Sequence, residues 1–348
     1  TSGSTGTPKG VAISHKSAIN YIEWACETFN FKDDLKIASQ APFIFDNSVL
    51  DIYLTLKMGS TLFLIPQELF TFPIKVVEYL KKNEINFIFW VPSILTNIAA
   101  LDLLKGVNLG LKFIIFAGEV MPVKTMNYFK SRFKNAVLAN LYGPTETTVD
   151  CAYYVVDRDF SDEESLPIGY PCKNTDVFLL DENDALVTAR NTLGELCVRG
   201  ASLALGYYND SVKTASAFTQ NPLNLAYPER IYRTGDLAYY NERGELMYKG
   251  RKDFQIKHMG YRIELGEIET AALSLSGVDS ACALYDGAIV LIYTSQTAVS
   301  QREILLNLGK ILPKYMLPTR FVMLDEMPLN VNGKIDRNKL KELIKDQK

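Results

Sequence analysis

Short apolar runs alternate with helical patterns over the first 150 residues, and this alternation constrains the fold more than any other feature. Four runs are typical of buried strands: residues 62–65, 87–91, 113–116 and 137–141. Residues 75–82 and 123–133 instead carry apolar side chains at helical spacing, with charged side chains on the other face. Strands that are apolar throughout are covered on both faces, as in parallel sheets. The sequence therefore predicts an α/β domain from Val11 to about Ala152.

The pattern changes after Cys151 to shorter segments in which apolar residues alternate with polar ones. Residues 177–180 and 194–199 are two such segments, and a hairpin is expected around residues 241–244. Together they predict an antiparallel, β-barrel-like portion. We therefore divide the large domain, residues 1–252, into an α/β part, residues 1–152, and a β-rich part, residues 153–252.

A third pattern follows a boundary at residues 250–253 and predicts a small α+β domain over residues 253–348. Its expected elements are a helix at residues 267–275, strands at residues 281–284 and 288–293, and a helix from Gln301. Ser300 and Glu303 have the spacing of a capping box for that last helix.

Composition limits the classes of function. The 348 residues are 47% hydrophobic and 22% charged, which is enough apolar material for a large core. A net charge of −3 argues against a general binder of nucleic acids or anionic membranes. No apolar run reaches the roughly 20 residues of a membrane span. The scattered cysteines, which predict reduced thiols and a cytoplasmic location, are Cys26, Cys151, Cys172, Cys197 and Cys282.

The first ten residues, TSGSTGTPKG, have the composition of a phosphate-binding loop. Glycines let backbone N–H groups converge on an anion, hydroxyl groups add donors, and Lys9 adds a positive charge. The spacing is not that of a Walker A loop, and a flexible Gly/Ser linker is the alternative. A phosphate loop normally follows a buried strand, which is missing before Thr1, so we expect this chain to be an N-terminally truncated part of a longer one.

Two further segments carry side chains suited to a nucleotide. The loop at residues 140–148 follows an expected strand, where open α/β sheets bind ligands. It offers Tyr142 for stacking on a purine, Thr145 for an α-phosphate and Glu146 for magnesium. Asp236 follows a glycine and can accept hydrogen bonds from two ribose hydroxyls. In both segments a purely structural turn is the alternative.

Three charged residues stand at turns or boundaries. Lys334 is presented by an Asn–Gly turn, and its alternative role is that of a solvated surface lysine. Arg251 and Asp253 lie at the domain boundary, where a charged pair suits either a solvated linker or a hinge.

Asp46 is a carboxylate in what reads as an otherwise apolar strand, flanked by Phe45 and Val49. A carboxylate in such surroundings is costly unless it meets a cation, and the α-ammonium group of an amino acid is a suitable partner. The alternative is an aspartate that caps a turn by bonding to the backbone.

Taken in order along the chain, these segments closely resemble the adenylate-forming superfamily. The matching segments are TSGSTGTPKG, FDNSVLDIY, NLYGPTETT, GELCVRG, YRTGD, GRKDFQIKHMGYRIELGEIE and NGKIDR, which span essentially the whole sequence. Within that superfamily the chain resembles amino-acid-activating enzymes. FDNSVLDIY, FAGEVMP and DFQIKHMGYR are most similar to D-alanine:D-alanyl carrier protein ligases, with adenylation domains of nonribosomal peptide synthetases close behind.

The resemblance implies a ligase that uses ATP and Mg²⁺. An amino acid carboxylate attacks the α-phosphate, giving an aminoacyl adenylate and pyrophosphate, so charge neutralisation dominates the barrier. The implied catalytic residues are Lys334, Thr145 and Glu146, with Glu146 also the metal ligand. The implied ATP-binding residues are Thr1, Ser2, Gly3, Ser4, Thr5, Gly6, Lys9, Asn140, Leu141, Tyr142, Gly143, Pro144, Thr145, Asp236, Tyr248, Arg251 and Lys334.

The resemblance also implies which residues meet the amino acid. They are Asp46, Asn47, Leu50, Phe89, Ile115, Ala117, Leu141, Val149, Asp150 and Lys334. Most are bulky and apolar, which favours a small substrate. D-alanine ligases carry cysteine where Ala117 stands, so D-alanine is one candidate. Asp150 favours a hydroxyl or amine on the substrate, as in serine or a diamino acid, or else is solvated at the rim.

In the implied second step, the small domain rotates about Asp253 and brings residues 257–261 to the site. Lys257 and Gly260 then border the path of the carrier protein's phosphopantetheine, whose thiol receives the aminoacyl group. Two alternatives remain: an acyl-CoA synthetase that uses free coenzyme A, and a non-catalytic interaction module. We also expect a missing N-terminal segment of the same polypeptide to pack against residues 1–150.

Overall fold

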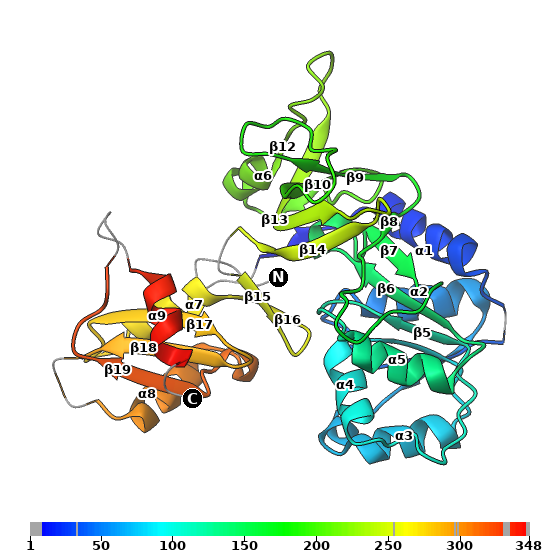
Figure 1. Cartoon of the computed structure of the whole chain (residues 1–348), viewed down its shortest axis with the longest axis horizontal. Helices are drawn as coiled ribbons and strands as arrows, with labels where there is room; N and C mark the ends of the chain where they lie inside the picture. The colour runs from blue at the N-terminus through cyan, green and yellow to red at the C-terminus, as the bar shows by residue number, and fades with distance from the viewer. Residues whose placement is uncertain are drawn as a thin grey trace. The chain divides into compact units, whose positions relative to one another are not determined.

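The computed structural model describes residues 9–32, 34–252, 255–295, 297, 299–329 and 335–345, with Lys345 described by its backbone alone. The chain forms two compact units (Figure 1). The larger unit runs from Gly10 to Lys252, and the smaller one contains the residues up to Lys9 and those from Asp253 onward. Within the described ranges, no helix is both long and apolar enough to cross a membrane.

A seven-stranded sheet in the order β3-β2-β4-β5-β6-β7-β8 forms the centre of the larger unit. Its first five strands are parallel, and β7 and β8 are antiparallel to their neighbours. The strands are β2 (Lys36–Ser39), β3 (Thr61–Leu64), β4 (Phe87–Trp90), β5 (Phe113–Phe116), β6 (Val137–Tyr142), β7 (Ala152–Val155) and β8 (Tyr170–Pro171). The predicted parallel sheet is confirmed.

Helices cover both faces of this sheet, as the fully apolar strands require. One face carries α1 (His15–Phe29) and α2 (Ser48–Met58), and the other carries α3 (Pro73–Lys82), α4 (Pro92–Ala100) and α5 (Val123–Arg132), with η1 (Gln67–Thr71) before α3 (Figure 1).

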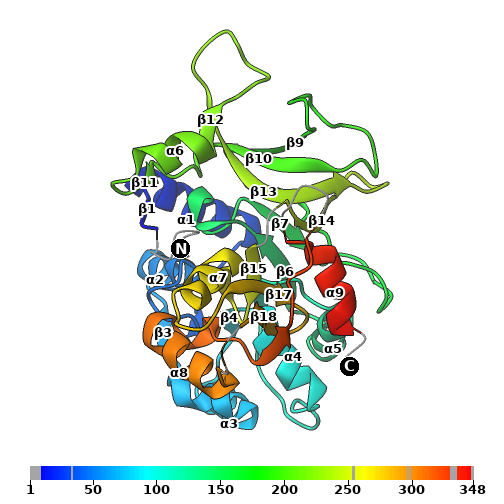
Figure 2. The same cartoon turned by 90° about the vertical axis from the view of Figure 1, so that its left-hand side faces the viewer.

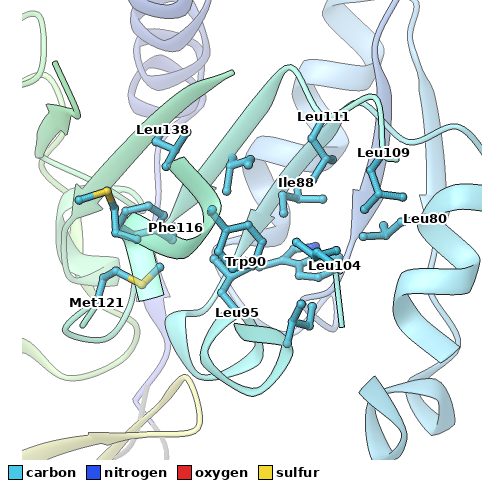
Figure 3. Close-up of a cluster of buried hydrophobic side chains, with 14 of the residues drawn as sticks. Leu80, Ile88, Trp90, Leu95, Leu104, Leu109, Leu111, Phe116, Met121 and Leu138 are labelled. Carbon is cyan, nitrogen blue, oxygen red and sulfur yellow. The ribbon is translucent and has the colours of Figure 1, made fainter. Parts of the chain in front are cut away.

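Strand β4 shows how alternate side chains serve the two faces. Phe87 and Phe89 pack with the α1 and α2 side, whereas Ile88 and Trp90 pack with the α3 to α5 side. Figure 3 shows Ile88 and Trp90 among the leucines of this second cluster. The Trp90 indole Nε1 also donates a 2.8 Å hydrogen bond to the carbonyl of Ala38, so its buried polar atom is satisfied.

The β-rich part of the larger unit is antiparallel, as predicted. Strand β13 pairs with β12 over its first residues, with β10 along its length and with β14 over its last residues, and β9 pairs with β10. A short ladder of β1 with β11 lies apart from this sheet. The elements are β1 (Val11–Ala12), β9 (Thr175–Leu180), β10 (Gly194–Gly200), β11 (Gly206–Tyr207), α6 (Ser211–Ala217), β12 (Phe218–Gln220), β13 (Arg230–Tyr240) and β14 (Leu246–Arg251).

The smaller unit has a three-stranded sheet, β17-β18-β19, and a separate hairpin of β15 with β16 (Figure 1). Figure 2 shows β17 and β18 of this sheet in a second view. The predicted capping box of its second helix is confirmed, because Ser300 and Glu303 exchange side-chain and backbone hydrogen bonds. Its elements are β15 (Gln255–His258), β16 (Tyr261–Glu264), α7 (Leu265–Leu273), β17 (Ser280–Tyr285), β18 (Ile289–Thr294), α8 (Gln301–Ile311), η3 (Lys314–Met316), β19 (Arg320–Leu324) and α9 (Arg337–Lys345).

The expected strand around Asp46 is wrong. Asp46 lies in a turn just before α2, and the Val49 N–H donates a 2.9 Å hydrogen bond to the Asp46 carbonyl. Pro42 and Ser48 favour this turn, since the Pro42 carbonyl accepts from Phe45 N–H and the Ser48 hydroxyl donates to the Phe45 carbonyl. The apolar residues after it recur at helical rather than strand spacing.

Candidate functional site

The loop after β6 is folded back sharply on itself. A Cβ on Gly143 would lie 2.4 Å from the carbonyl oxygen of Val149, so the loop needs glycine here. Thr148 and Val149 have φ of 58° and 71°, a left-handed conformation that is unfavourable for β-branched side chains. Such backbone strain is typical of functional loops held by their surroundings. The Cys151 N–H donates to the Tyr142 carbonyl at 2.8 Å and closes the loop.

Thr145 links this loop to the start of α2. It opens a short 3₁₀ helix, η2 (Thr145–Thr147), and its hydroxyl donates a 2.5 Å hydrogen bond to the Asp46 carboxylate. The structure therefore brings together two residues that were assigned separately to ATP and to the amino acid. Their role in binding stays a prediction.

Glu146 is fully buried at the same loop. Its carboxylate accepts a 2.7 Å hydrogen bond from the Tyr207 hydroxyl, and its carbonyl accepts from the Ala204 N–H at 2.9 Å. Burial, together with the negative charge of Glu146, raises the pKa of Tyr207, so the phenol remains a donor. Strand β11, which carries Tyr207, pairs with β1, the strand that follows the predicted phosphate loop. Glu146 is thus linked through Tyr207 and the β1–β11 ladder to the strand that follows that loop.

A single buried carboxylate such as that of Glu146 is suited to Mg²⁺ at a nucleotide site. Magnesium is usually bound through one or two carboxylates plus substrate phosphates rather than by a protein cage. Among the described residues, no group of three His, Cys, Asp or Glu side chains could form such a cage. Glu146 as the metal ligand stays a prediction.

Two of the predicted ATP-binding residues contact the carboxylate of a third, Asp236, and a fourth, Tyr248, packs beside one of them. The Tyr142 hydroxyl donates to Asp236 Oδ2, and the Arg251 guanidinium pairs with Asp236 Oδ1 at 2.8 Å. The centroids of the Tyr142 and Tyr248 rings lie 6.3 Å apart. Burial, and next the charge of Asp236, raises the pKa of Tyr142. A carboxylate has about four lone-pair sites, so Asp236 keeps acceptor capacity for two ribose hydroxyls.

The remaining loop residues have structural contacts of their own. Asn140 is buried and donates from its side-chain amide to the Pro167 carbonyl at 2.7 Å. Leu141 points to the opposite face of the sheet from Asn140 and packs with the α1 and α2 side. Pro144 caps η2, because its carbonyl accepts from the Thr147 N–H.

The apolar residues predicted to line the amino acid site share one cluster on the α1 and α2 face of the sheet. This cluster contains Leu50, Phe89, Ile115, Ala117, Leu141 and Val149. Asn47 precedes the first residue of α2 and is half-buried. These positions lie on α2, β4, β5 and β6 or directly follow or precede them, with Val149 in the loop between β6 and β7, so the parallel sheet gathers them.

Asp150 is not solvated at a rim. It is 2% exposed, and its carboxylate accepts a 2.7 Å hydrogen bond from the Tyr21 hydroxyl of α1. Burial and the neighbouring Asp150 charge raise the pKa of Tyr21. The two residues form a buried polar pair beside the apolar cluster, because Tyr21 itself packs in that cluster.

The residues that lead to the predicted hinge are tied into the β-rich sheet. The Lys252 N–H donates to the Gly235 carbonyl at 2.8 Å, and its ammonium group pairs with buried Glu195 at 3.1 Å. Asp253 itself lies outside the described residues, as do Thr1 to Gly6 and Lys334. Lys9 is half-buried and immediately precedes Gly10, the first residue of the larger unit.

The predicted thiolation segment lies in the smaller unit, in the hairpin of β15 and β16. Lys257 is exposed on β15, and Met259 and Gly260 form the turn with φ of 52° and 82°. His258 Nδ1 lies 3.2 Å from the Tyr285 hydroxyl of β17. Only glycine adopts the Gly260 conformation without strain.

Sequence reasoning missed Tyr207, Tyr21 and Thr234. Thr234 donates to the Leu196 carbonyl at 2.7 Å and accepts from the Asp236 N–H, so it fixes the aspartate's backbone. Tyr21 and Tyr207 each reach a site carboxylate from more than 60 residues away. Of these residues, only Tyr207 had a local sequence signal for a role in the site, because it follows a glycine, Gly206, after an apolar run.

Residues 1–208 match the family described as AMP-binding enzyme. The chain belongs to the AMP-binding enzyme family. It is 36% identical to Zwittermicin A synthase ZmaJ of Bacillus cereus, covering 100% of this chain and 67% of that protein. It is also 36% identical to the D-alanine--D-alanyl carrier protein ligase of Lacticaseibacillus casei, over 98% of this chain and 69% of that protein. Its identity to the L-proline--[L-prolyl-carrier protein] ligase of Streptomyces coelicolor is 36% as well, over 98% of this chain and 64% of that protein.

Solved structures of adenylation domains share the fold. The Vibrio cholerae adenylation domain AlmE, solved with glycyl-adenosine-5'-phosphate, has a TM-score of 0.88 and 25% identity over 99% of this chain and 65% of that chain. PA1221, which contains adenylation and PCP domains, has a TM-score of 0.83 and 28% identity over 99% and 59%. The chain thus spans about two thirds of the length of Zwittermicin A synthase ZmaJ and of the two carrier protein ligases, and 5% of the length of tyrocidine synthase 3. The predicted resemblance and fold class are confirmed, and two of these relatives are carrier protein ligases, as the predicted type of enzyme is.

Proposed function

We propose that this chain carries most of an amino acid–carrier protein ligase. It activates an amino acid with ATP as an aminoacyl adenylate, releases pyrophosphate, and transfers the aminoacyl group to the phosphopantetheine thiol of a carrier protein. The observation that carries the proposal is the Thr145–Asp46 hydrogen bond, since it joins the loop of the nucleotide residues to the start of α2. The carrier-protein ligases among the relatives support the same activity.

In the adenylation step two anions must approach each other. Glu146 would hold Mg²⁺, which when bound would supply positive charge to the phosphates. Asp236 orients the ribose, with its own carboxylate fixed by Tyr142 and Arg251. The Thr145 hydroxyl donates to the α-phosphate after exchanging its Asp46 partner. Lys334, with Lys9 and the loop before it, neutralises the charge that develops on the phosphates.

In the substrate site Asp46 receives the α-ammonium group. Its carboxylate is half-buried, so a cation is held there more strongly than in water. The apolar cluster with Leu50, Ile115 and Val149 faces the side chain of the substrate and favours a small one. D-Alanine fits that size. Serine or a diamino acid fits if the Asp150–Tyr21 pair exchanges its internal hydrogen bond for one to the substrate.

In the transfer step the thiol attacks the adenylate carbonyl and releases its proton to solvent, so that the C–S bond forms. The bond between the carbonyl carbon and the phosphate oxygen breaks, and AMP leaves with its electrons. The hairpin turn with Gly260 lines the path of the phosphopantetheine arm. A side chain at this position would obstruct that path. Rotation about Asp253 exchanges Lys334 for this hairpin at the site.

A further segment of the polypeptide is proposed to pack against residues 1–150, where the outer face of helix α2 is exposed and apolar. This helix is apolar on almost all sides, and Tyr53 and Leu56 are 49% and 72% exposed. Ile19 of α1 is 61% exposed as well. The relatives carry sequence beyond the matched part, which supports this assignment. A chain that begins at Thr1 and is fully active as a soluble monomer would contradict it.

Carrier loading tests the proposed function directly. The full-length protein is incubated with ATP, Mg²⁺, single amino acids and a phosphopantetheinylated carrier, and the carrier is weighed by intact mass spectrometry. The proposal predicts a mass increase of one aminoacyl group for a small amino acid, and none without ATP. Preferential transfer to free coenzyme A would indicate an acyl-CoA synthetase instead, and loading with only a large aromatic amino acid would contradict the small site.

A further inference from the structure

Strand β13 leaves its regular ladder with β10 at residues 234–236, which include Asp236, the residue proposed to orient the ribose. Ladder pairs form at Arg233 and at Leu237, and between them β13 advances four positions (233 to 237) while β10 advances two (195 to 197). Such a β-bulge bends the strand and changes the direction of its side chains, and bulges are common beside functional sites. Backbone groups in the bulge lose their regular partners on β10 and must be satisfied in another way.

Two side chains satisfy N–H groups of this bulge. The Thr234 hydroxyl accepts from the Asp236 N–H at 2.9 Å. The carboxylate of Glu195, which lies on the neighbouring strand β10, accepts from the Gly235 N–H at 3.3 Å. Gly235 has a φ of 73°, a left-handed conformation that favours glycine. Glu195 therefore holds the residue directly before Asp236 in an unusual backbone conformation.

The same carboxylate pairs with two cations. Arg233 Nε lies 3.0 Å from Glu195 Oε2, and Lys252 Nζ lies 3.1 Å from it. The Glu195 side chain is only 8% exposed, and burial of a carboxylate is costly unless cations and hydrogen-bond donors compensate it. Glu195 thus joins two neighbouring positions of β13, Arg233 and Gly235, to the residue that follows β14.

Lys252 extends this connection to the partner of Asp236. Arg251 lies opposite Asp236 in the β13–β14 ladder, and the two form an ion pair at 2.8 Å. The next residue, Lys252, donates its N–H to the Gly235 carbonyl at 2.8 Å and pairs with Glu195 through its ammonium group. Glu195 therefore contacts both the residue before Asp236 and the residue after Arg251. A shift of either strand would change the direction of the Asp236 carboxylate.

We propose that Glu195 is a positioning residue of the nucleotide site, whose buried carboxylate joins Gly235 to Lys252 and so keeps Asp236 directed at both ribose hydroxyls. It acts through Asp236 rather than by touching the nucleotide. The inference rests on the proposed function for the contact between Asp236 and the ribose.

The test measures how strongly the full-length protein depends on the ribose hydroxyls. The Kd of AMP and the Kd of 2′,3′-dideoxyadenosine monophosphate, which lacks both hydroxyls, are measured by isothermal titration calorimetry. The ratio of the second Kd to the first is compared between variants. Glu195→Gln keeps the size of the side chain and removes its charge. Lys252→Met removes one tie only, from a side chain that is 46% exposed, so it should fold even if Glu195→Gln does not.

Asp184→Asn is the matched control. Asp184 pairs with Arg233 at 2.7 Å, so this variant removes a negative charge from the same network. In the described part of the chain, Asp184 forms no hydrogen bond or ion pair with Gly235 or Lys252.

For the wild type we expect a Kd ratio of about tenfold or more, because the two hydrogen bonds that the analogue lacks end on a charged group. Glu195→Gln should raise the Kd of AMP about three- to tenfold and leave the Kd of the analogue nearly unchanged, so that the ratio falls. Lys252→Met should lower the ratio by a smaller factor, and Asp184→Asn should keep it.

An unchanged ratio in Glu195→Gln, or in Lys252→Met if Glu195→Gln does not fold, would overturn the inference. An equal rise of both Kd values would overturn it as well, because that result indicates a purely structural role. So would an equal fall of the ratio in Asp184→Asn. A wild-type ratio near one would contradict the ribose contact of Asp236 in the proposed function, and the inference with it.

Discussion

Asp46 accepts a hydrogen bond from Thr145 and is the residue through which we propose that the site selects amino acids. Removing one partner of a partly buried charge pair costs at least about 2 kcal/mol, equivalent to about thirtyfold in affinity. We therefore predict that Asp46→Ala raises KM for the amino acid about thirtyfold or more, measured by exchange, while KM for ATP changes little. The exposed Asp34, which pairs with Lys112, supplies a control in Asp34→Ala. An equal rise in KM for ATP would contradict the assignment.

Tyr207 gives a second test at this scale, because its hydroxyl is bonded to the buried Glu146 carboxylate. Hydrogen bonds to charged groups contribute about 1.5–3 kcal/mol. Tyr207→Phe should lower the free energy of unfolding by about that amount and change the Mg²⁺ concentration needed for half-maximal exchange. The neighbouring Tyr208 is 73% exposed, so Tyr208→Phe is the matched control. If both variants behaved alike, Tyr207 would have no special role at Glu146.

At the scale of elements, the loop after β6 depends on the missing side chain of Gly143. A methyl group there would lie 2.4 Å from the Val149 carbonyl oxygen and 2.5 Å from Asp150 Cα. Gly143→Ala should therefore destabilise the protein by about 1–3 kcal/mol, as other overpacking changes do, and reduce exchange by displacing Asp150. Gly110 has no atom near its added Cβ, so Gly110→Ala should be close to neutral. Denaturant unfolding of both variants checks this prediction.

The spacing of apolar residues predicts helices and strands well where local sequence alone determines the element. The strand at residues 113–116 and the capping box at Ser300 are as expected, since apolar runs and capping residues act locally. Asp46 shows the limit: an apolar flank was read as a strand, although turn hydrogen bonds and helical spacing place it before α2. A short apolar run does not distinguish strand from helix without its tertiary neighbours.

The candidate site was predictable to the extent that its residues sit in short motifs. Tyr142, Asp236 and Arg251 were assigned from three separate motifs and lie together in the structure. Tyr21 and Tyr207 were missed because their partners are 129 and 61 residues away. Nothing local in the sequence specifies such contacts, which the packing of α1 and β11 creates. For the same reason, the sequence does not distinguish a substrate-binding Asp150 from one that is solvated at the rim.

At the scale of the whole molecule, the two half-reactions should depend on different parts of the smaller domain. Lys334→Ala should suppress pyrophosphate exchange by orders of magnitude and spare transfer from preformed aminoacyl adenylate, since its charge acts only in adenylation. Gly260→Leu should block transfer to the carrier and spare exchange. Gly287 has a similar left-handed φ of 69° in the same unit, so Gly287→Leu controls for backbone strain. If Lys334→Ala and Gly260→Leu impaired both steps equally, the alternating use of this domain would be wrong.

The most direct test of the central claim is ATP–pyrophosphate exchange by the full-length wild-type protein across single amino acids, acetate and a fatty acid. Exchange reports formation of an acyl adenylate without needing a carrier, so it isolates the step assigned to Asp46, Glu146 and Asp236. The account predicts exchange driven by a small amino acid such as D-alanine or serine, and none above background with acetate or the fatty acid. Equal exchange with a simple carboxylic acid, or no exchange with any amino acid, would contradict it.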